Sequence, residues 1–352
     1  GVDSFINDKK KSFKKNSYIV DIGNSHPSDT LRRSEYLKKY KINYIGCGFS
    51  GGSYGARTNA SIMVSCSNKQ FIFLKDLLTD IVGKKNTKYL KRISDNPSAG
   101  HLSKIIHNGI EYGIMQSIAD MYLIFKKILK LNDKFIVEEF NKLNNLIGSS
   151  YLIDITNQII KNEKLNKFSI DNVLDKIDDN NTGAWAVNLS LKYKFPVPSI
   201  SSSVEARFLS KQERFVKNFD FTKKIKKNVI YKIKNEMKFI SELCIISCYL
   251  QGLGLLQEIA NKEKININLK NVLLSWTKNS IIRSDILSEY FFLVKKNKIN
   301  INSIIKKKIS LKTKKKIINI MNFLINNNIT LPSVSSLYNW TNLITNKKNI
   351  SF

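Results

Sequence analysis

The chain carries SAGHLSKIIHNGIEYGIMQ at residues 98–116, within a long helical pattern. Helical spacing places Lys104, His107, Asn108, Glu111 and Tyr112 on one face, because they stand at i, i+3, i+4, i+7 and i+8. Apolar residues occupy the other sides of this helix. Burying such a polar face is costly unless each group finds a partner, so the pattern singles it out as a candidate site.

Two structural interpretations compete with a functional one. Lys104 and Glu111 would form an ordinary solvated stripe in many lysine-rich helices. A single histidine such as His107 is more often structural than catalytic. Spacing alone leaves these alternatives open.

The composition describes a folded chain with a large positive charge. Its 352 residues suffice for a large core and two domains, and a hydrophobic content of 42% excludes a disordered chain. The 58 basic residues against 28 acidic ones give a net charge of +30, which would attract nucleic acid or another polyanion. Because the basic residues are spread along the chain, without one basic motif interleaved with aromatics, we expect no specific nucleic-acid partner.

The cysteines and the hydropathy indicate a reducing compartment. The four cysteines do not fit a secreted disulfide framework or a familiar metal site. Cys244 and Cys248 lie one helical turn apart, which also suits a pair of metal ligands, but buried free thiols are the favoured interpretation. No signal peptide or run of about 20 apolar residues is evident, so we expect a cytoplasmic protein with no membrane partner. Because the cysteines do not fit a metal site, we expect no metal.

The first hundred residues alternate between strand and helix patterns. Runs of β-branched and apolar residues predict strands, and a helical pattern separates the first two. The predicted elements are strands at 18–24, 42–48 and 60–67 and a helix at 31–40, capped by Asp29 or Thr30. Such alternation favours a mostly parallel sheet covered by helices.

Ligands of parallel sheets bind where the strands end at their carboxyl edge. Asn24 follows the first predicted strand, and Ser50, Gly51 and Gly52 form a tight turn after the second. We therefore expect these residues to lie beside any bound molecule.

A boundary is predicted at Asn96-Pro97, because proline disfavours helix in the residue before it and is favoured where a helix begins. The long helix should begin near Ser98, and the chain beyond it is helical in pattern. The predicted helical runs are 98–130, 134–145, 149–163 and 224–261, with a break at 180–183. The sequence thus predicts an α/β domain at 1–97 and a large all-α domain at 98–352.

The motif HNGIEYG at 107–113, with Gly100 and Lys104 before it and Met115-Gln116 after it, resembles the signature helix of the 6-phosphogluconate dehydrogenases. These are the decarboxylating enzymes of the pentose phosphate pathway. VDSFI at 2–6, the D-x-G-N-S strand end at 21–25 and S-G-G-x-x-G-A-R at 50–57 are similar to the family in the same order.

The resemblance implies that residues 1–97 are the C-terminal part of an NADP-binding Rossmann-like domain. Residues 98–352 would then be an all-helical substrate and dimerisation domain, and the segment 276–287 would serve helix packing and the dimer framework. The family's Gly-rich nucleotide-binding turn and its C-terminal tail have no counterpart in this sequence. We therefore expect a truncated or incompletely recorded copy of the enzyme.

The activity implied by the resemblance is oxidation of 6-phosphogluconate at C3 with NADP as hydride acceptor, followed by loss of CO2 to give ribulose 5-phosphate, in a homodimer. Lys104 would be the general base, and it must be uncharged to accept the C3 hydroxyl proton. Glu111 would be the general acid that protonates C1, which requires a raised pKa.

The resemblance also implies the binding residues. Asn24 would touch both cofactor and substrate, and an arginine fork suits the substrate phosphate. The remaining substrate contacts would come from Ser50, Gly51, Gly52, His107, Asn108, Tyr112 and, within an A-R-x-L-S pattern, Arg207.

One departure affects the phosphate site. Where the family reads G-T-G-K-W-T, with its lysine and last threonine on the substrate, this chain has Ala184 and Ala186. Losing a charged contact would cost about 1.5 to 3 kcal/mol, unless Lys192 or Lys194 compensates. Two alternatives therefore stay open: a catalytically degenerate homologue of the same fold, and a basic nucleic-acid-binding protein, which only the net charge favours.

Overall fold

A computed structural model describes residues 1–162, 176–177, 181–212 and 226–345 of the chain. The chain forms two compact units, Gly1–Asn108 with Leu256–Ile299, and Gly109–Leu255 with Asn300–Phe352. It passes from one to the other inside helix α5 (Ala99–Leu123). The domain division at residue 97 stays a prediction from the sequence; the compact units differ from it in grouping residues 98–108 and 256–299 with the N-terminal part.

A four-stranded sheet in the order β1-β2-β3-β4 organises the first unit. The strands are β1 (Tyr18–Asp21), β2 (Asn43–Ser50), β3 (Ser61–Ser65) and β4 (Leu90–Ser94). β1 pairs with β2 in parallel, and so does β3 with β4, but β2 and β3 are antiparallel. The expected mostly parallel sheet is therefore mixed, because only the short helix α3 (Gly52–Thr58) separates β2 from β3 and a parallel crossover needs a dozen residues or more.

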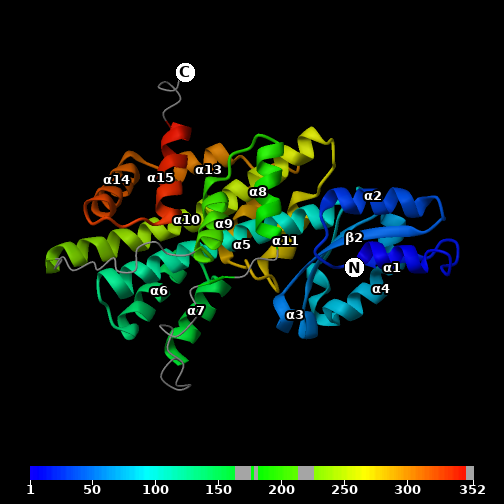
Figure 1. Ribbon diagram of the computed structural model, residues 1–352, viewed down its shortest axis with the longest axis horizontal. Coiled ribbons are helices and arrows are strands. Elements are labelled where there is room, and N and C mark those ends of the chain that lie inside the picture. Colours follow the sequence, from blue (N-terminus) through cyan, green and yellow to red (C-terminus); the bar gives the residue numbers. More distant parts are fainter. Residues whose placement is uncertain (163–175, 178–180, 213–225, 346–352) are drawn as a thin grey trace. The chain divides into compact units, whose positions relative to one another are not determined.

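Helices cover both faces of this sheet (Figure 1). Helices α1 (Val2–Lys9) and α2 (Pro27–Lys38) lie on one face, and α4 (Asn68–Val82) lies on the other. Side chains alternate along β2, so Ile45 and Cys47 pack in the core with α4, whereas Tyr44 packs with Leu37 of α2. Because alternate residues of a strand lie on the same face, Gly46, Gly48 and Ser50 lie on the face of Tyr44 and α2.

Three local features differ from the sequence-based expectations. The predicted cap of α2 by Asp29 or Thr30 is wrong: the helix begins earlier, at Pro27, and His26 Nδ1 accepts a hydrogen bond from the Ser28 N–H at 3.4 Å. Proline fits the first helical position because it lacks the N–H that would be left unpaired there. Strand β4 and helix α4, which begins with a Ser67–Gln70 capping box, had no counterpart among the predicted elements.

The first turn of α5 lies directly against β2 with no layer of side chains between them. A Cβ atom at Gly48 would lie 2.5 Å from the Gly100 carbonyl oxygen, and one at Gly100 would lie 2.6 Å from the Gly46 carbonyl oxygen. Only glycine permits backbones to approach so closely. These glycines therefore set the position of α5 on the sheet.

The C-terminal segment of the first unit completes its core. Helix α11 (Leu269–Thr277) packs against β3 and β4, and α12 (Asp285–Leu293) follows it. The Asn268 N–H donates to the Ile93 carbonyl oxygen at 2.7 Å, and Asn271 Nδ2 donates to the Arg92 carbonyl oxygen at 2.8 Å. This segment brings Trp276 and Ser280 into the core, where both are fully buried.

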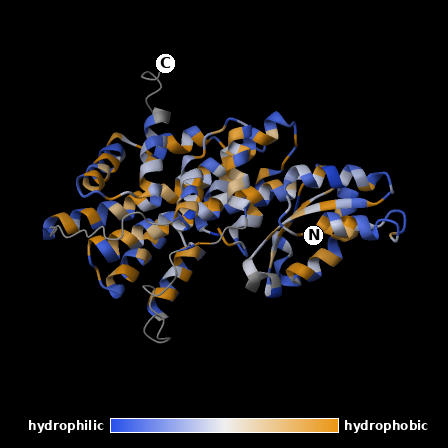
Figure 2. Ribbon diagram, in the orientation of Figure 1, coloured by the Kyte–Doolittle hydropathy of each residue, from blue (hydrophilic) through white to orange (hydrophobic). Residues whose placement is uncertain are grey.

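The second unit is helical in its described residues, and with the mixed sheet of the first unit this confirms the predicted fold class. Most of its helices show alternating polar and apolar bands in Figure 2, as amphipathic helices do. Its elements are the end of α5, the π-helical turn η2 (Ile124–Ile128), α6 (Asp133–Ile147), α7 (Tyr151–Asn162), α8 (Thr182–Lys192), α9 (Pro198–Ser210), α10 (Lys227–Lys262, whose last residues belong to the first unit), α13 (Ile301–Lys308), α14 (Leu311–Asn326) and α15 (Pro332–Thr345).

The predicted helical runs match these helices closely. The run 98–130 ends differently, because α5 gives way to the π-helical turn at Ile124. Residues 163, 180 and 224–225 of the predicted elements lie outside the described residues. The predicted break before Trp185 falls at Asn181, which precedes α8 with a φ of 64°.

Among the helices that the structure describes, α10 is long and apolar enough to cross a membrane. Of its most apolar window, however, 94% is buried inside the protein. This burial is typical of a core helix.

The four cysteines are free and buried, as the favoured interpretation predicted. Cys248 Sγ donates a hydrogen bond to the Cys244 carbonyl oxygen at 3.1 Å, and burial raises the pKa of the Cys248 thiol to about 12. Across residues 1–162, 176–177, 181–212 and 226–345, no three His, Cys, Asp or Glu side chains gather as a metal ion would require.

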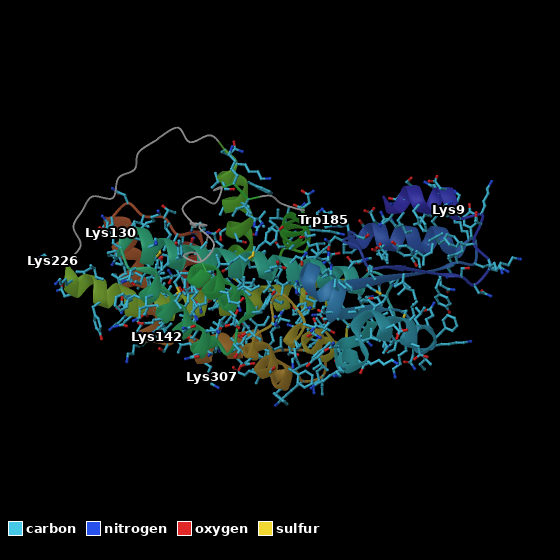
Figure 3. The ribbon with its side chains drawn as sticks, turned by 90° about the horizontal axis from the view of Figure 1, so that it is seen from below. Lys9, Lys130, Lys142, Trp185, Lys226 and Lys307 are labelled. Atoms are coloured by element: carbon cyan, nitrogen blue, oxygen red, sulfur yellow. The ribbon has the colours of Figure 1, made fainter. Side chains whose placement is uncertain are left out.

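Exposed lysines come from many elements rather than from one. Figure 3 labels several exposed lysines from different parts of the chain: Lys9, Lys130, Lys142, Lys226 and Lys307. This distribution agrees with a general surface charge.

We predict that Gly48→Ala destabilises the protein by about 1 to 3 kcal/mol, because its Cβ would meet the Gly100 carbonyl oxygen at 2.5 Å. Gly55→Ala is the matched control, since its Cβ would meet nothing within 4 Å. Thermal unfolding of the two variants checks this. Equal melting temperatures for Gly48→Ala and the unsubstituted protein would show that α5 does not need this close approach.

Candidate active site

The first four turns of α5 are almost completely inaccessible to solvent. From Ser98 to Ile114 the side chains and glycines are buried, except that Lys104 and Glu111 are each partly exposed. Two helical turns separate these two residues, which places them on the same side of the helix. The face as a whole is not a solvated stripe, because His107, Asn108 and Tyr112 are buried, whereas Lys104 and Glu111 keep part of their exposure.

His107 is the centre of a buried polar cluster in the first unit. Its Nε2 atom lies 2.9 Å from Ser50 Oγ and 2.8 Å from Ser280 Oγ. Its Nδ1 atom lies 3.1 Å from Asn108 Oδ1, and its ring packs edge-on against Trp276 with centroids 5.9 Å apart. Three segments far apart in the sequence thus meet at one imidazole.

Lys104 lies one turn before His107, above β2. A Cβ at Gly48 would be 3.1 Å from Lys104 Cβ, which places the start of the lysine side chain over the strand that ends in Ser50. Burial lowers the pKa of His107 well below 6.5, and the Lys104 charge lowers it further, while the hydrogen bond with Asn108 has the opposite effect. His107 is therefore a neutral imidazole near pH 7.

The turn after β2 requires glycine, as its sequence predicted. Gly51 has a φ of 139° and Gly52 a φ of 64°, both in the region that side chains disfavour. A Cβ at Gly51 would also lie 3.1 Å from the Asn279 carbonyl oxygen. The turn thus directs the chain away from Ser50 while keeping that residue against His107; the substrate contacts of Ser50, Gly51 and Gly52 remain predictions.

Asn24 is exposed in the loop after β1. The loop is fixed at its base by the buried Asp21 carboxylate, which accepts hydrogen bonds from the Gly23 N–H at 2.9 Å and from Ser25 Oγ at 2.7 Å. Because β1 and β2 are parallel with Asp21 opposite Gly46, this loop and Ser50 lie at the same edge of the sheet. Within the described residues, no hydrogen bond joins Asn24 to the His107 cluster.

A second pair of predicted residues meets in the second unit. The Arg207 guanidinium of α9 stacks on the Tyr112 ring of α5, with Cζ 3.7 Å from the ring centroid. Both residues are mostly buried, and a Cβ at Gly183 would lie 2.5 Å from the Tyr112 ring. Glu111, beside Tyr112 in the sequence, is partly exposed.

The alanines of α8 occupy unequal environments. Ala186 is fully buried, and a Cβ at Gly109 would lie 2.9 Å from its methyl group, so this position packs α8 against α5. Ala184 is only partly buried. Lys192 follows it by eight residues, ~12 Å along the helix axis, and is exposed, as is Lys194. These positions do not support compensation of Ala184 by either lysine.

Ser280 is the member of the His107 cluster that the sequence analysis missed. The segment 276–287 was interpreted as helix packing and dimer framework. The polar break Lys278-Asn279-Ser280 between two apolar helical patterns was the available signal, because connecting segments disproportionately carry binding residues.

Comparison with known proteins gives the family. The family model described as "6-phosphogluconate dehydrogenase, C-terminal domain" matches residues 100–350, and the one described as "NAD binding domain of 6-phosphogluconate dehydrogenase" matches residues 1–90. The chain belongs to the 6-phosphogluconate dehydrogenase family. The family predicted from HNGIEYG is thereby confirmed.

Individual members of this family agree with that assignment. The decarboxylating 6-phosphogluconate dehydrogenase of Buchnera aphidicola (strain APS) is 32% identical over 92% of this chain, and that of Caenorhabditis elegans is 33% identical over 84%. This chain spans 71% and 63% of the lengths of these two relatives.

A solved structure shares the fold. The 6-phosphogluconate dehydrogenase of Plasmodium falciparum superposes with a TM-score of 0.85 and 26% identity, over 99% of this chain and 77% of that one. Its structures include complexes with its cofactor NADP+ and its substrate 6-phosphogluconate.

We predict that Lys104→Met raises the pKa of His107, because it removes a positive charge that opposes protonation of the imidazole. Burial, the larger cause, should still hold the pKa below 6.5 in this variant. An NMR pH titration of the His107 ring checks both statements. An unchanged or lower pKa in Lys104→Met would mean that the lysine charge does not act on the imidazole.

Proposed function

We propose that this chain catalyses the oxidative decarboxylation of 6-phosphogluconate to ribulose 5-phosphate and CO2, with NADP as hydride acceptor. The observation that carries the proposal is the burial pattern of α5, in which Lys104 and Glu111 alone stay partly exposed between Ser98 and Ile114. A base and an acid on one side of an otherwise buried helix are what the reaction requires. The family membership and the NADP+ and 6-phosphogluconate complexes of the Plasmodium falciparum enzyme support it.

Lys104 is the proposed general base. As an uncharged amine it accepts the proton of the C3 hydroxyl while the C3 hydrogen leaves as hydride. As an ammonium it then stabilises the oxygen of the 3-keto intermediate, which assists loss of CO2. Glu111 is the proposed acid that protonates C1 of the resulting enediol.

The buried cluster supplies neutral hydrogen-bonding groups for the sugar acid. Burial alone, the larger cause, lowers the pKa of His107 well below its usual range, so the ring is uncharged and can orient hydroxyls without neutralising a carboxylate. Asn108 and Ser50 offer an amide and a hydroxyl next to it, at 3.1 and 2.9 Å from its ring nitrogens. We assign the substrate hydroxyls and carboxylate to these groups and to the Gly51-Gly52 turn.

The substrate phosphate is assigned to Arg207 and Tyr112. The guanidinium Cζ lies over the tyrosine ring, 3.7 Å from its centroid, and this contact restricts the movement of the arginine side chain. A preorganised arginine loses little freedom on binding an anion, and this favours a phosphate contact.

The residues after β1 fit part of a dinucleotide. Asn24 and Gly23 are exposed at the carboxyl end of a parallel strand, where they offer an amide side chain and backbone groups to a ligand. Asp21 holds this loop through the Gly23 N–H and Ser25. We propose that Asn24 contacts NADP, which supplies the hydride acceptor.

Assembly and location follow from the same resemblance. We propose a homodimer that works in the cytoplasm, with 6-phosphogluconate as its small-molecule substrate and no specific nucleic-acid partner. The spread of exposed lysines over separate elements supports the last point (Figure 3).

The direct test is 6-phosphogluconate-dependent formation of NADPH. We predict that Lys104→Ala lowers kcat by at least about a hundredfold, since positioned acid–base groups contribute this much or more. Lys75→Ala, an exposed lysine of α4, is the control and should keep full activity. Equal rates for Lys104→Ala and the unsubstituted protein would remove the proposed base, and no turnover by the unsubstituted protein would favour a degenerate homologue.

We predict that Ala184→Lys lowers KM for 6-phosphogluconate roughly tenfold, because it restores a charged contact to the phosphate. The position is partly exposed, so the longer side chain can be accommodated. Ala184→Gln, which adds length without charge, is the matched control. A KM that does not change in Ala184→Lys would mean that the phosphate is bound without help from this position.

A further inference from the structure

Two serine hydroxyls lie within hydrogen-bond distance of His107 Nε2, but this nitrogen can accept only one strong hydrogen bond. Nε2 faces two serine oxygens at nearly equal distances, 2.9 Å to Ser50 and 2.8 Å to Ser280. Both serines are buried, with exposed fractions of 2% for Ser50 and 0% for Ser280. The direction of these two hydrogen bonds decides which hydroxyl has a proton to offer to a ligand.

The other side of the ring fixes the tautomer. Asn108 Oδ1 can only accept a hydrogen bond, and it lies 3.1 Å from His107 Nδ1, so Nδ1 carries the proton. Burial lowers the pKa of His107 well below its usual range and keeps the ring neutral, so Nε2 has no proton and one lone pair. That lone pair can accept one strong hydrogen bond, from one of the two serines.

Both serines already accept hydrogen bonds from the same loop. The Ile282 N–H donates to Ser280 Oγ at 3.2 Å, and the Ile281 N–H lies 3.4 Å from Ser50 Oγ. The proton of each hydroxyl is therefore available for donation to another acceptor. Ser280 has no exposed surface, so its hydroxyl is the better placed donor to the imidazole.

We propose that Ser280 is a positioning residue that donates its hydroxyl proton to His107 Nε2 and so leaves the Ser50 proton free for the substrate. Ser50 ends β2 and precedes the Gly51-Gly52 turn, at the sheet edge where we expect ligands to bind. Ser280, by contrast, is fully buried. Ser50 would then donate to an oxygen of the sugar acid. The inference rests on the proposed function for the identity of that ligand.

The binding test is a double-mutant cycle on Ser50 and Ser280. In Ser280→Ala the Ser50 proton turns to His107, so we expect the Kd of 6-phosphogluconate to rise roughly three- to tenfold. In a Ser50→Ala background the same substitution should leave Kd unchanged. Ser280→Cys, which keeps a weak donor, should recover part of the affinity, and Ser275→Ala, a buried serine of α11 that bonds within its own helix, should lose none. Additive effects in the cycle would overturn the proposal.

The spectroscopic test needs no substrate. Two-bond proton–nitrogen spectra of the free protein should show His107 protonated on Nδ1 and not on Nε2. Ser280→Ala should shift the Nε2 resonance as the donor changes from Ser280 to Ser50, and adding Ser50→Ala should shift it further. Ser50→Ala alone should leave it nearly in place. A proton on Nε2, or the reverse pattern in the two variants, would overturn the proposal.

The two tests also separate this inference from the proposed function. A protein that does not bind 6-phosphogluconate but shows the expected Nε2 shifts would contradict the function and support the role of Ser280. A protein that turns the substrate over while Nε2 responds to Ser50→Ala alone would support the function and overturn the role of Ser280.

Discussion

The close approach of α5 to β2 is the constraint on which the rest of the site depends. Glycines at 46, 48 and 100 let the two backbones touch, with Cβ positions that would lie within 2.5 to 2.6 Å of carbonyl oxygens. Contacts between backbones leave less freedom than contacts between flexible side chains. Lys104 is therefore held over the strand, and His107 one turn later meets Ser50 at its end. Helix α5 thus contributes to the packing against the sheet and also positions the polar groups of the site.

The burial of α5 also determines the chemistry of its polar face. A buried imidazole stays neutral because water no longer stabilises its charge, and a nearby lysine strengthens this tendency. The neutral ring needs partners for both nitrogens, and Asn108, Ser50 and Ser280 supply them. Solvent access is restricted to two groups, and these are the ones to which proton transfer is assigned.

Features set by local sequence could be predicted, and features set by distant segments could not. The start of α5 after Pro97 and the glycine turn after Ser50 follow from short-range sterics. The antiparallel β3 and the arrival of Ser280 at His107 depend on where later segments return to the sheet, which no local pattern records. The roles of Lys104, Glu111 and Arg207 came from the resemblance, because spacing alone suits a solvated stripe equally well.

A crystal structure with 6-phosphogluconate bound tests the central claim most directly, namely that the polar face of α5 over β2 holds the substrate. We predict that Lys104 Nζ and Ser50 Oγ each lie within about 3 Å of a substrate oxygen, with Ser280 still on the imidazole. A substrate bound away from Lys104, His107 and Ser50 would contradict it.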